Sequence, residues 1–598
     1  MPSDDKKYLP IKYLNREFTE IRADLLDMAE RFYPDTFQDF SEASFGALMI
    51  DSVAYVADQL NFYLDYNVNE SFLNTSFESS NIIRHGRALG YKNQGRPSTY
   101  GEVAIYMQVP ADQYGIGPDT GYIPIMSRGS NFTSQNGLAF MLIENVDFGD
   151  PANPIVVSKV NASTGAPTHY AIKAYANVVS GRLGQKTFTI GDFERFRSIS
   201  LSDPNIVEIV SIYDAEGNQY YEVDYLSQDM VFREVANKNY KNDNVASVLK
   251  PLLVSRKFTV EHTSNEVIIQ FGSGDDSATN VVANPQNVAI DVFGKNYVTD
   301  TTFDPTRISK NRSYGIVPAN TTLFVTYRTT NSNNSNVAAG TINKVNNAQL
   351  SFENPNVLSQ TKIAELRESI EVSNEKPITG DVRNPSSAEI KRRIIDTFPT
   401  QNRAVTQNDY ENVVYRMPSK YGSVKRVSVY KDQDSMKRNL NMYVISENES
   451  RKLVATNATI KNNIKTWLNN YRMINDTIDI LDPYIINLGI DFVIRLAHGA
   501  NSEEVLGNCI TQLSQNYNET FFIGESFQSS DIYSILKSIQ GVLDVSSVKI
   551  TNKSGGQYSP TTFNVTKNTS PDGTRVLCPS NAIFEIKFPT SDIRGKIR

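Results

Sequence analysis

The residues of this chain that could do chemistry fall in short motifs, and each motif lacks a partner that its chemistry needs. Residues 272–274 (GSG) have the glycines of a phosphate-binding loop, but no helix is predicted to follow them, so a β-turn is the better interpretation. Residues 214–218 (DAEGN) resemble the start of a calcium loop. They lack the bidentate acid at the twelfth position, and Gly-Asn is typical of a turn between strands. Residues 524–526 (GES) lack the second glycine of a nucleophile elbow.

Ionisable residues elsewhere form no catalytic or metal-binding pattern. The acid pairs Asp275–Asp276 and Asp432–Asp434 could hydrolyse a glycoside only if a second element faced them across a cleft, so solvated turns are the better interpretation. The histidines and cysteines show no metal-ligand spacing. They are His85, His169, His262, His498, Cys509 and Cys578. We therefore predict no metal, no cofactor and no catalytic residue, and we expect the protein not to be an enzyme.

Composition sets the class of molecule. A chain of 598 residues is long enough for roughly three to five domains, and 40% hydrophobic residues suffice for packed cores. The net charge of -7 argues against a nucleic-acid binder, and the basic trio 391–393 is interpreted as a solvated helix face. Two cysteines fit a reducing compartment. No signal sequence and no membrane-spanning run is predicted, so we expect assembly in a cytoplasm without membrane insertion.

The first 96 residues are predicted to be helical. Large apolar residues recur at spacings of three and four along two stripes, and the second stripe continues to Leu64. The stripes contain Phe18, Ile21, Leu25, Met28, Phe32, Phe45, Leu48, Met49, Val53, Val56 and Leu60. A third, short helix is predicted to end at Gly90. Three such helices form either a self-contained bundle or part of a bundle completed by another chain, and the long second helix favours the latter.

Residues 97–345 are predicted to be β-rich and to form two units, because short alternating runs replace the helical period. Residues 206–213 and 220–225 are predicted to be a hairpin around Gly217. Residues 346–385 are polar and are interpreted as a linker. Residues 386–598 mix helices and strands. Capping boxes are expected at Ser386 with Glu389 and at Thr406 with Asp409. The predicted fold class is therefore multidomain α+β, with a C-terminal region that folds separately.

Several longer segments resemble the Baseplate J-like family. Residues 402–414 (NRAVTQNDYENVV) resemble its Arg-Ala-Val-Thr-x-x-Asp-Tyr signature, and residues 51–91 resemble its entry helices, which end in Leu-Gly-Tyr. Residues 123–142, 271–274 and 314–330 resemble its β-segments. Residues 522–550 and 580–597 resemble the large baseplate wedge subunits of T-even-like phages. The loop 331–336 departs from the family's Gly-rich turn, and we expect its asparagines to adopt left-handed conformations instead.

The resemblance implies a structural wedge subunit in the tail baseplate of a virion. Such subunits link wedges into a ring around the tail hub that changes diameter when the sheath contracts. The implied partners are other wedge proteins and further copies of the chain, two per wedge, with hub and sheath-initiating proteins as further partners. The eleven stripe residues are then expected to form a partner interface. Ile532, Ile535 and Leu536 are candidates for self-association, with internal core as the alternative.

Two other functions remain open at this point. A homologous component of a bacterial contractile injection system would have the same fold in a different particle, and neighbouring genes would separate the two. A tail protein that binds or hydrolyses polysaccharide would need aromatic residues and paired acids along a cleft.

Overall fold

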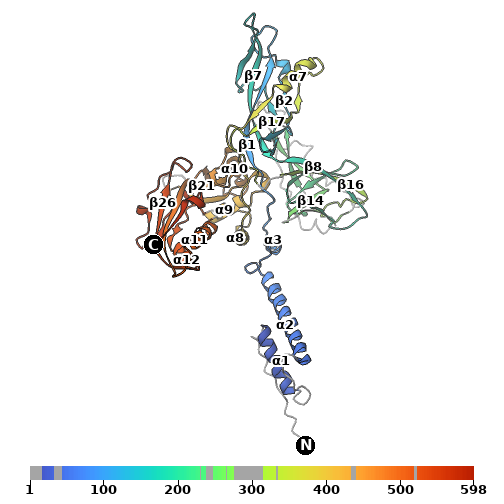
Figure 1. The fold of residues 1–598 in the computed structure, drawn as a ribbon. Helices are drawn as coiled ribbons and strands as arrows, with labels where there is room; N and C mark the ends of the chain where they lie inside the picture. The colour runs from blue at the N-terminus through green and yellow to red at the C-terminus, as the bar shows by residue number, and fades with distance from the viewer. Residues whose placement is uncertain are drawn as a thin grey trace. The chain divides into compact units, whose positions relative to one another are not determined.

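The computed structural model describes residues 17–32, 44–228, 230–236, 247–263, 266–274, 314–330, 334–432, 439–517 and 521–598. The chain folds into two compact units, one formed by residues up to 91 with 385–395 and the other by 92–384 with 396–598. Helices dominate the start, strands the middle, and both occur in the C-terminal region (Figure 1). The predicted α+β fold class is confirmed.

The first unit contains the three predicted helices, α1 (Phe18–Phe32), α2 (Phe45–Glu70) and α3 (Ser79–Ala88). Ser44 begins α2 as an N-cap, because its hydroxyl accepts a hydrogen bond from the Ala47 N–H at 3.1 Å. The helix α8 (Ser387–Thr400) also begins in this unit.

A small core joins α3 to the start of α8. It consists of buried Ile82, Tyr91 and Ile394. A Cβ at Gly86 would lie 2.8 Å from Ile394 Cδ1, so the two helices approach closely only because residue 86 is glycine. The Ser386 hydroxyl accepts from the Glu389 N–H at 3.3 Å, which is the predicted start of α8.

The second unit begins with an antiparallel sheet whose central strands are β7 (Pro167–Ser180) and β1 (Tyr100–Pro110). The strand order is β17-β3-β4-β7-β1-β19, and β6 (Ile155–Val160) also pairs with β7. The other strands are β3 (Asn131–Ser134), β4 (Ala139–Leu142), β17 (Ile342–Asn347) and β19 (Glu371–Ser373). A separate small sheet joins β2 (Ile125–Met126) to β5 (Val146–Asp147) and β18 (Leu350–Ser351).

A second β-sheet is inserted between β7 and β17. Its order is β8-β16-β10-β11-β14-β15-β9, and only β11 and β14 pair in parallel among these neighbours. The strands are β8 (Arg182–Ile190), β9 (Ser198–Leu201), β10 (Ile206–Tyr213), β11 (Gln219–Glu222), β14 (Lys257–His262), β15 (Val267–Phe271) and β16 (Thr321–Thr329). β12 (Met230–Ala236) and β13 (Ser247–Leu253) form a ribbon. Each large sheet covers its own buried core.

The predicted linker at residues 346–385 is wrong. This segment contains β18, the helix α7 (Gln360–Glu368) and β19, and β19 pairs with β1 through Ile105 and Val372. Ile363 and Leu366 of α7 are buried in the core of the first sheet. The segment therefore completes the first β-sheet after the inserted one, and its polar composition reflects the exposed sides of α7 and β19.

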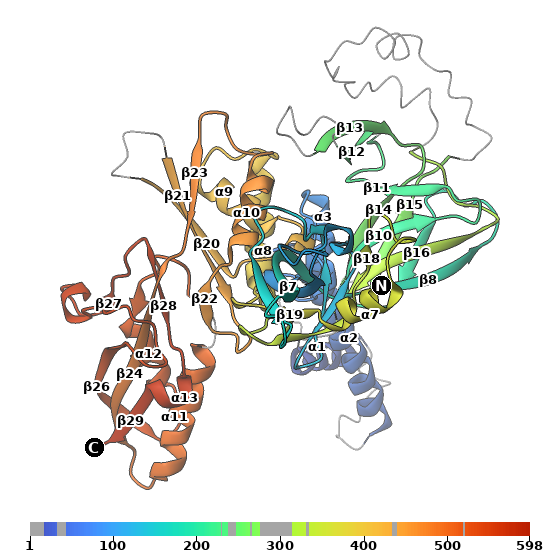
Figure 2. The same cartoon turned by 90° about the horizontal axis from the view of Figure 1, so that it is seen from above.

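The C-terminal region has two sheets. The first contains β20 (Arg426–Lys431), β21 (Asn439–Glu447), β22 (Leu453–Ala455) and β23 (Thr477–Leu481), together with α9 (Gln407–Tyr415) and α10 (Ala458–Leu468). The second contains β24 (Tyr484–Leu496), β26 (Val542–Lys553), β28 (Ala582–Glu585) and β29 (Ile593–Ile597). Against it pack α11 (Ser502–Asn516), α12 (Ser529–Lys537) and α13 (Pro589–Asp592) (Figure 2). A short ribbon pairs β25 (Phe527–Gln528) with β27 (Arg575–Val576).

The predicted separability of the C-terminal region is contradicted by a shared core. Tyr100, Met141 and Val179 of the first β-sheet are buried in the same cluster as residues of α9, α10, β20 and β21. A cut near residue 384 would expose both sides of that cluster. The Thr406–Asp409 capping box is confirmed, since the Thr406 hydroxyl accepts from the Asp409 N–H at 3.2 Å.

A buried polar junction, formed by Asn336, Asp381, Glu447, Arg451 and Lys425, connects the end of the inserted sheet to β21. The Asn336 amide N–H donates to the backbone oxygens of Asp381 at 2.7 Å and Glu447 at 3.0 Å. Its amide oxygen accepts from the Asp381 N–H at 3.0 Å. Arg451 pairs with the Asp381 carboxylate at 3.2 Å, and Lys425 with Glu447 at 3.2 Å.

The left-handed conformations expected for the loop 331–336 do not occur in its described part, residues 334–336. None of residues 334–336 has a positive φ, and residues 331–333 lie outside the described residues. Asn336 is 1% exposed, and its side-chain amide forms the buried hydrogen bonds described above.

We predict that Asn336→Ala destabilises the second unit by about 1–3 kcal/mol for each backbone group left buried and unpaired. Urea unfolding followed by tyrosine fluorescence would measure the loss. The matched control is Asn346→Ala, because Asn346 is exposed, and its effect should stay within about 0.5 kcal/mol. Equal effects of the two substitutions would contradict the role of the junction.

Candidate assembly interface

The helix pair α1–α2 is held together along one side of α2. Asp51 of α2 pairs with Arg22 of α1. Ala47 and Ala54 lie four residues before and three after Asp51, so they share its face of the helix, and both are buried. The fully buried side chains on this face of α2 are therefore small; Ile50 beside them is half-buried, and most of the other large apolar side chains of α2 are exposed.

One stripe of exposed apolar side chains runs along α2 at spacings of four and three. Its members are Met49, Val53, Val56, Leu60 and Tyr63, each between 51% and 57% exposed. Alternation of three and four is the a/d pattern of a coiled-coil seam, where each side chain inserts between four side chains of a partner helix. We call these five residues the first seam.

A second stripe lies on another side of α2. Leu48, Tyr55 and Phe62 are seven residues apart, so they align along the helix, and they are 60%, 58% and 62% exposed. The ring of Phe62 stacks on Tyr66 with centroids 6.4 Å apart, which extends the stripe by about one turn. We call these four residues the second seam. With α1 on one side and a seam on each of two others, α2 has the sequence of a helix inside a bundle.

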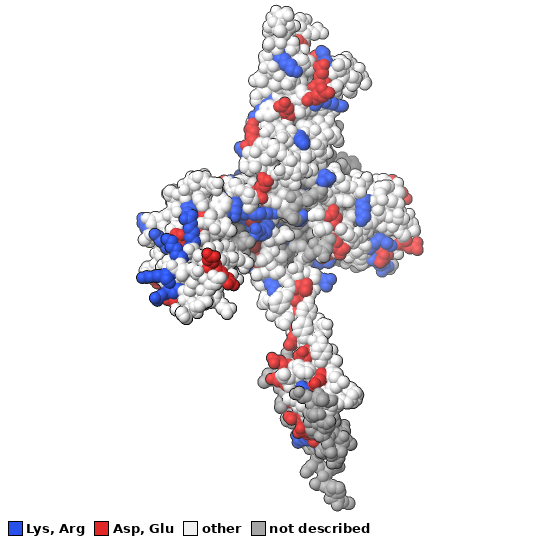
Figure 3. All heavy atoms as spheres, viewed as in Figure 1, with Lys and Arg blue, Asp and Glu red and all other residues white. Residues whose placement is uncertain are grey.

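The charges of α2 are all acidic. The helix contains no Lys or Arg, and Asp51, Asp58 and Asp65 follow at intervals of seven, which places them along one line. Figure 3 shows largely uncharged surface along the segment that contains α1 and α2, with acidic side chains beside it. The line of aspartates runs along the face that Asp51 shares with Ala47 and Ala54, toward α1, so the seams themselves specify only an apolar stripe on a partner helix.

The eleven predicted interface residues divide by position. Phe18, Ile21 and Leu25 of α1 are half-buried, whereas the other eight are exposed. That a partner covers the exposed eight stays a prediction. Tyr55, Phe62 and Tyr66 were not predicted, because a single amphipathic stripe was assumed for this helix. The nearly uninterrupted apolar sequence of α2 indicates that apolar side chains lie on more than one of its sides.

The bend between α2 and α3 is fixed by one carboxylate. Glu70, 7% exposed at the end of α2, accepts hydrogen bonds from the N–H groups of Phe77 at 2.6 Å and Glu78 at 3.2 Å, and from the Asn81 amide at 2.9 Å. It thereby caps α3, whose own N-cap residue, Glu78, makes no side-chain cap. The Asn81 hydrogen bond and then the Phe77 N–H hold the pKa of Glu70 below its usual value.

The self-association candidates lie in the second C-terminal sheet. Ile532 and Leu536 are 0% exposed and belong to its core, and Ile535 is half-buried against that core. Ile532 and Leu536 are therefore wrong as a contact surface, and the internal-core alternative is correct for them; the prediction for Ile535 stays a prediction. A helical period identifies the covered face of α12 but does not distinguish a partner from the chain's own sheet.

The motifs considered for chemistry have structural roles. The Asp214 carboxylate accepts from the N–H groups of Glu216 at 3.0 Å and Asn218 at 2.8 Å, which closes the turn of the predicted β10–β11 hairpin. A Cβ at Gly272 would lie 2.2 Å from the Gly315 oxygen, so this glycine allows two backbone segments to touch. Asp275, Asp276 and Asp434 lie outside the described residues.

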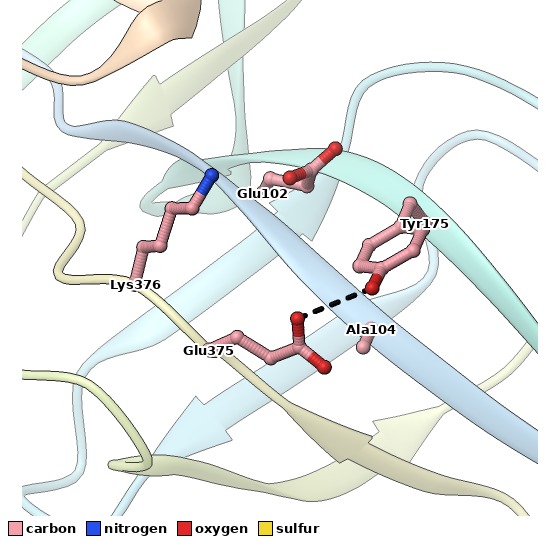
Figure 4. Close-up of a pocket in the computed structure, with 5 residues that line it drawn as sticks. All are labelled: Glu102, Ala104, Tyr175, Glu375 and Lys376. Atoms are coloured by element: carbon pink, nitrogen blue, oxygen red, sulfur yellow. Dashed lines mark hydrogen bonds between the residues drawn. The ribbon is translucent and has the colours of Figure 1, made fainter.

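A pocket of about 160 Å³ on the first β-sheet is lined by Glu102, Ala104, Tyr175, Glu375 and Lys376 (Figure 4). The Tyr175 hydroxyl donates to Glu375 at 3.2 Å. Beside the pocket, the Lys173 ammonium donates to Glu375 and to the Tyr175 hydroxyl, each at 2.6 Å. The Lys173 hydrogen bond lowers the pKa of Glu375, and the same bond raises the pKa of Lys173. Both groups stay charged at neutral pH, which suits neither for proton transfer.

Among the described residues, no three His, Cys, Asp or Glu side chains gather as metal ligands would, and no helix is long and apolar enough to cross a membrane. The expected lack of metal, cofactor and catalysis stays a prediction.

The helical segment at the start of the chain is similar to a known protein family. Residues 17–88 match the model of a family described as bacteriophage baseplate protein, N-terminal domain. These residues contain α1, α2 and α3, and the match supports a baseplate protein. No curated protein matches the chain.

Two solved baseplate structures have low similarity to the chain. One is the six-fold symmetrised anti-feeding prophage baseplate, with 9% identity, a TM-score of 0.25, and 94% of this chain and 90% of that chain covered. The other is the type VI secretion system TssK-TssF-TssG baseplate subcomplex, with 8% identity, a TM-score of 0.23, and 73% and 96% covered. Scores this low carry no argument about this chain.

We predict that Glu70→Gln loosens the bend between α2 and α3. A carboxylate with a lowered pKa contributes stability above its unfolded pKa of about 4.3, and that stability is lost as the pH falls toward the lowered value. Protease cleavage between residues 70 and 79 should therefore accelerate below about pH 4.3 in the unmodified protein. In the variant, cleavage should already be faster at pH 7. Glu78→Gln is the matched control, and an equal effect there would refute the cap.

Proposed function

We propose that this chain is a structural wedge subunit of the baseplate in a contractile phage tail. The proposal rests on two features that occur in the same segment. The segment that matches a baseplate N-terminal domain, residues 17–88, is also the segment with the two uncovered apolar seams of α2. A helix of this kind is unfavourable in water alone, which is the property expected of a subunit that becomes complete by assembly.

The seams set the number and kind of partner helices. Each seam needs at least one helix to cover it, so the occupied state is a bundle of α1, α2 and helices from other wedge proteins. Covering a large apolar side chain contributes roughly 1.5–3 kcal/mol, and the first seam alone has five such residues. Only part of this total appears as affinity, because association costs translational and side-chain freedom.

The wider role follows from the same proposal. The chain links wedges into the ring around the tail hub, with other wedge proteins, further copies of itself and hub or sheath-initiating proteins as partners. It acts in the baseplate of the virion after assembly in the host cytoplasm, and it takes part in the rearrangement at sheath contraction. Its role is structural and non-catalytic.

We predict that the double substitution Val56→Asp and Leu60→Asp blocks incorporation into baseplates by more than about tenfold. Two charges in the first seam would each replace about 1.5–3 kcal/mol of apolar burial with a desolvation cost. Both positions are exposed in the chain itself, 56% and 57%, so the second unit should keep its melting temperature. Complementation of a baseplate-deficient phage, followed by virion immunoblotting, measures incorporation.

The matched control keeps the seam apolar. Val56→Ile with Leu60→Met changes shape but not polarity, and it should assemble at near-normal levels. If the aspartate pair enters complete baseplates as well as this control, the bundle proposal is wrong. If the aspartate pair unfolds the isolated chain, the seam is ordinary core and the proposal is equally wrong.

A further inference from the structure

The strand β6 (Ile155–Val160) is an uncovered sheet edge. Within the described residues it pairs only with β7, and all six of its side chains are exposed. Four of them are β-branched and apolar, namely Ile155, Val156, Val157 and Val160, at 45%, 61%, 48% and 58% exposure. An edge strand of this composition is a template for pairing with another strand.

Two long edge strands elsewhere in the second unit carry charges that discourage such pairing. β8 has Arg182 and Lys186, and β26 has Lys549 and Lys553. In β6 the one charged residue is Lys159, which follows an irregularity in the pairing with β7. Residues 155–157 are therefore a regular stretch of edge with no charge.

The pairing with β7 determines which backbone groups face outward. Lys173 N–H donates to the Pro154 oxygen at 3.2 Å, and Ile155 lies opposite Ile172. In an antiparallel ladder the residues alternate, so the N–H and C=O of Val156 face β7, whereas those of Ile155 and Val157 face the open edge. The outward groups are thus spaced for a second antiparallel strand.

The side chains also favour an added strand. Ile155 and Val157 lie opposite Ile172 and Tyr170, both of which are buried on the core side of β7. They extend the apolar layer of the core past the last strand, while Val156 lies on the other face. A strand beside β6 would continue this layer if its residues on the core face were also apolar.

We propose that β6 pairs antiparallel with β6 of a second copy of this chain, around a two-fold axis at Val156. In this register Ile155 lies opposite Val157 of the second copy, and the two Val156 residues lie opposite each other. Each Ile155–Val157 pair exchanges two backbone hydrogen bonds through the groups that face outward. The strand is therefore complementary to itself in hydrogen bonding and in side-chain type, as a two-fold contact requires.

The charges near β6 favour this antiparallel second copy. Lys159 would lie opposite Asn153 of the other copy, close to the exposed Asp147 and Asp150 that precede its strand. The two lysines would be about 20 Å apart, at about 3.3 Å per residue. A parallel pairing would place them side by side. The short strand buries less than the roughly 1,200 Å² of a stable interface, so the contact is weak in the free chain and stronger where other contacts hold two copies together.

The test is a disulfide at the proposed axis. Val156 pairs across the axis without hydrogen bonds, where Cα atoms are about 4.5 Å apart, within the range of about 4.4–6.8 Å for disulfides. Under mild oxidation at tens of micromolar, Val156→Cys should form covalent dimers at least tenfold more than Ser158→Cys. The two copies of Ser158 would be about 14 Å apart. The unmodified chain controls for Cys509 and Cys578.

A second substitution tests the hydrogen bonding. Val157→Pro removes an outward N–H but none that faces β7, so in the Val156→Cys background it should abolish the cross-link while the circular dichroism spectrum is unchanged. Val157→Lys keeps this N–H but places a charge within the proposed contact, so it tests the pairing by charge if proline disturbs the strand.

Three results in the free chain would overturn the proposal: Val156→Cys stays monomeric, Ser158→Cys cross-links equally, or Val157→Lys has no effect. A fourth result concerns assembled baseplates. If a different protein alone protects the thiol introduced by Val156→Cys, the edge binds that protein and the proposal is also overturned. The pairing is independent of the α2 seams, so neither test decides the other.

Discussion

The buried polar junction is the constraint on which the arrangement of the second unit depends. Asn336, Asp381, Glu447, Arg451 and Lys425 come from three segments far apart in the chain, and they satisfy one another in a largely buried site. Burial raises the pKa of Asp381 despite the nearby Arg451 guanidinium, which indicates how strongly this site disfavours an uncompensated charge. Because loss of one partner leaves the others unpaired, the junction accepts a single arrangement of the segments.

That constraint explains why the chain can interrupt a sheet and return to it. The first β-sheet is left after β7 and resumed only at β17 and β19, with a complete second sheet in between. Arg328 of β16 is fully buried and donates to the Ser180 oxygen at 2.6 Å and to the Ser98 hydroxyl at 2.9 Å, while it pairs with Glu208 at 2.8 Å. The inserted sheet is thus bound at its exit by a buried arginine and then by the junction. These contacts are polar and directional, so they determine geometry more than stability.

The sequence was sufficient for features that depend on near neighbours. The helical period predicted α1, α2 and α3, and the Thr406–Asp409 box and the β10–β11 hairpin follow from residues at most a few positions apart. The linker prediction failed because the membership of β19 is decided by its pairing with β1, more than 260 residues away in the chain (for example Ile105 with Val372). The α12 residues failed for a related reason: Ile532 and Leu536 have the same spacing whether they face a sheet or a partner.

The uncovered surfaces follow a different rule from the cores. In α2 the fully buried apolar side chains are alanines, so most of its large side chains stay exposed, and its isolated stability is correspondingly low because helices depend on packing. In β6 the regular stretch 155–157 lacks charges of the kind found on β8 and β26. Both surfaces are apolar, and β6 also has charges beside it, namely Lys159 and the acidic turn before the strand. Apolar centres supply attraction without direction, whereas the flanking charges select orientation and partner. Several such modest contacts, each alone too small for a stable complex, can hold an assembly firmly and still exchange one at a time, which a single large interface cannot do.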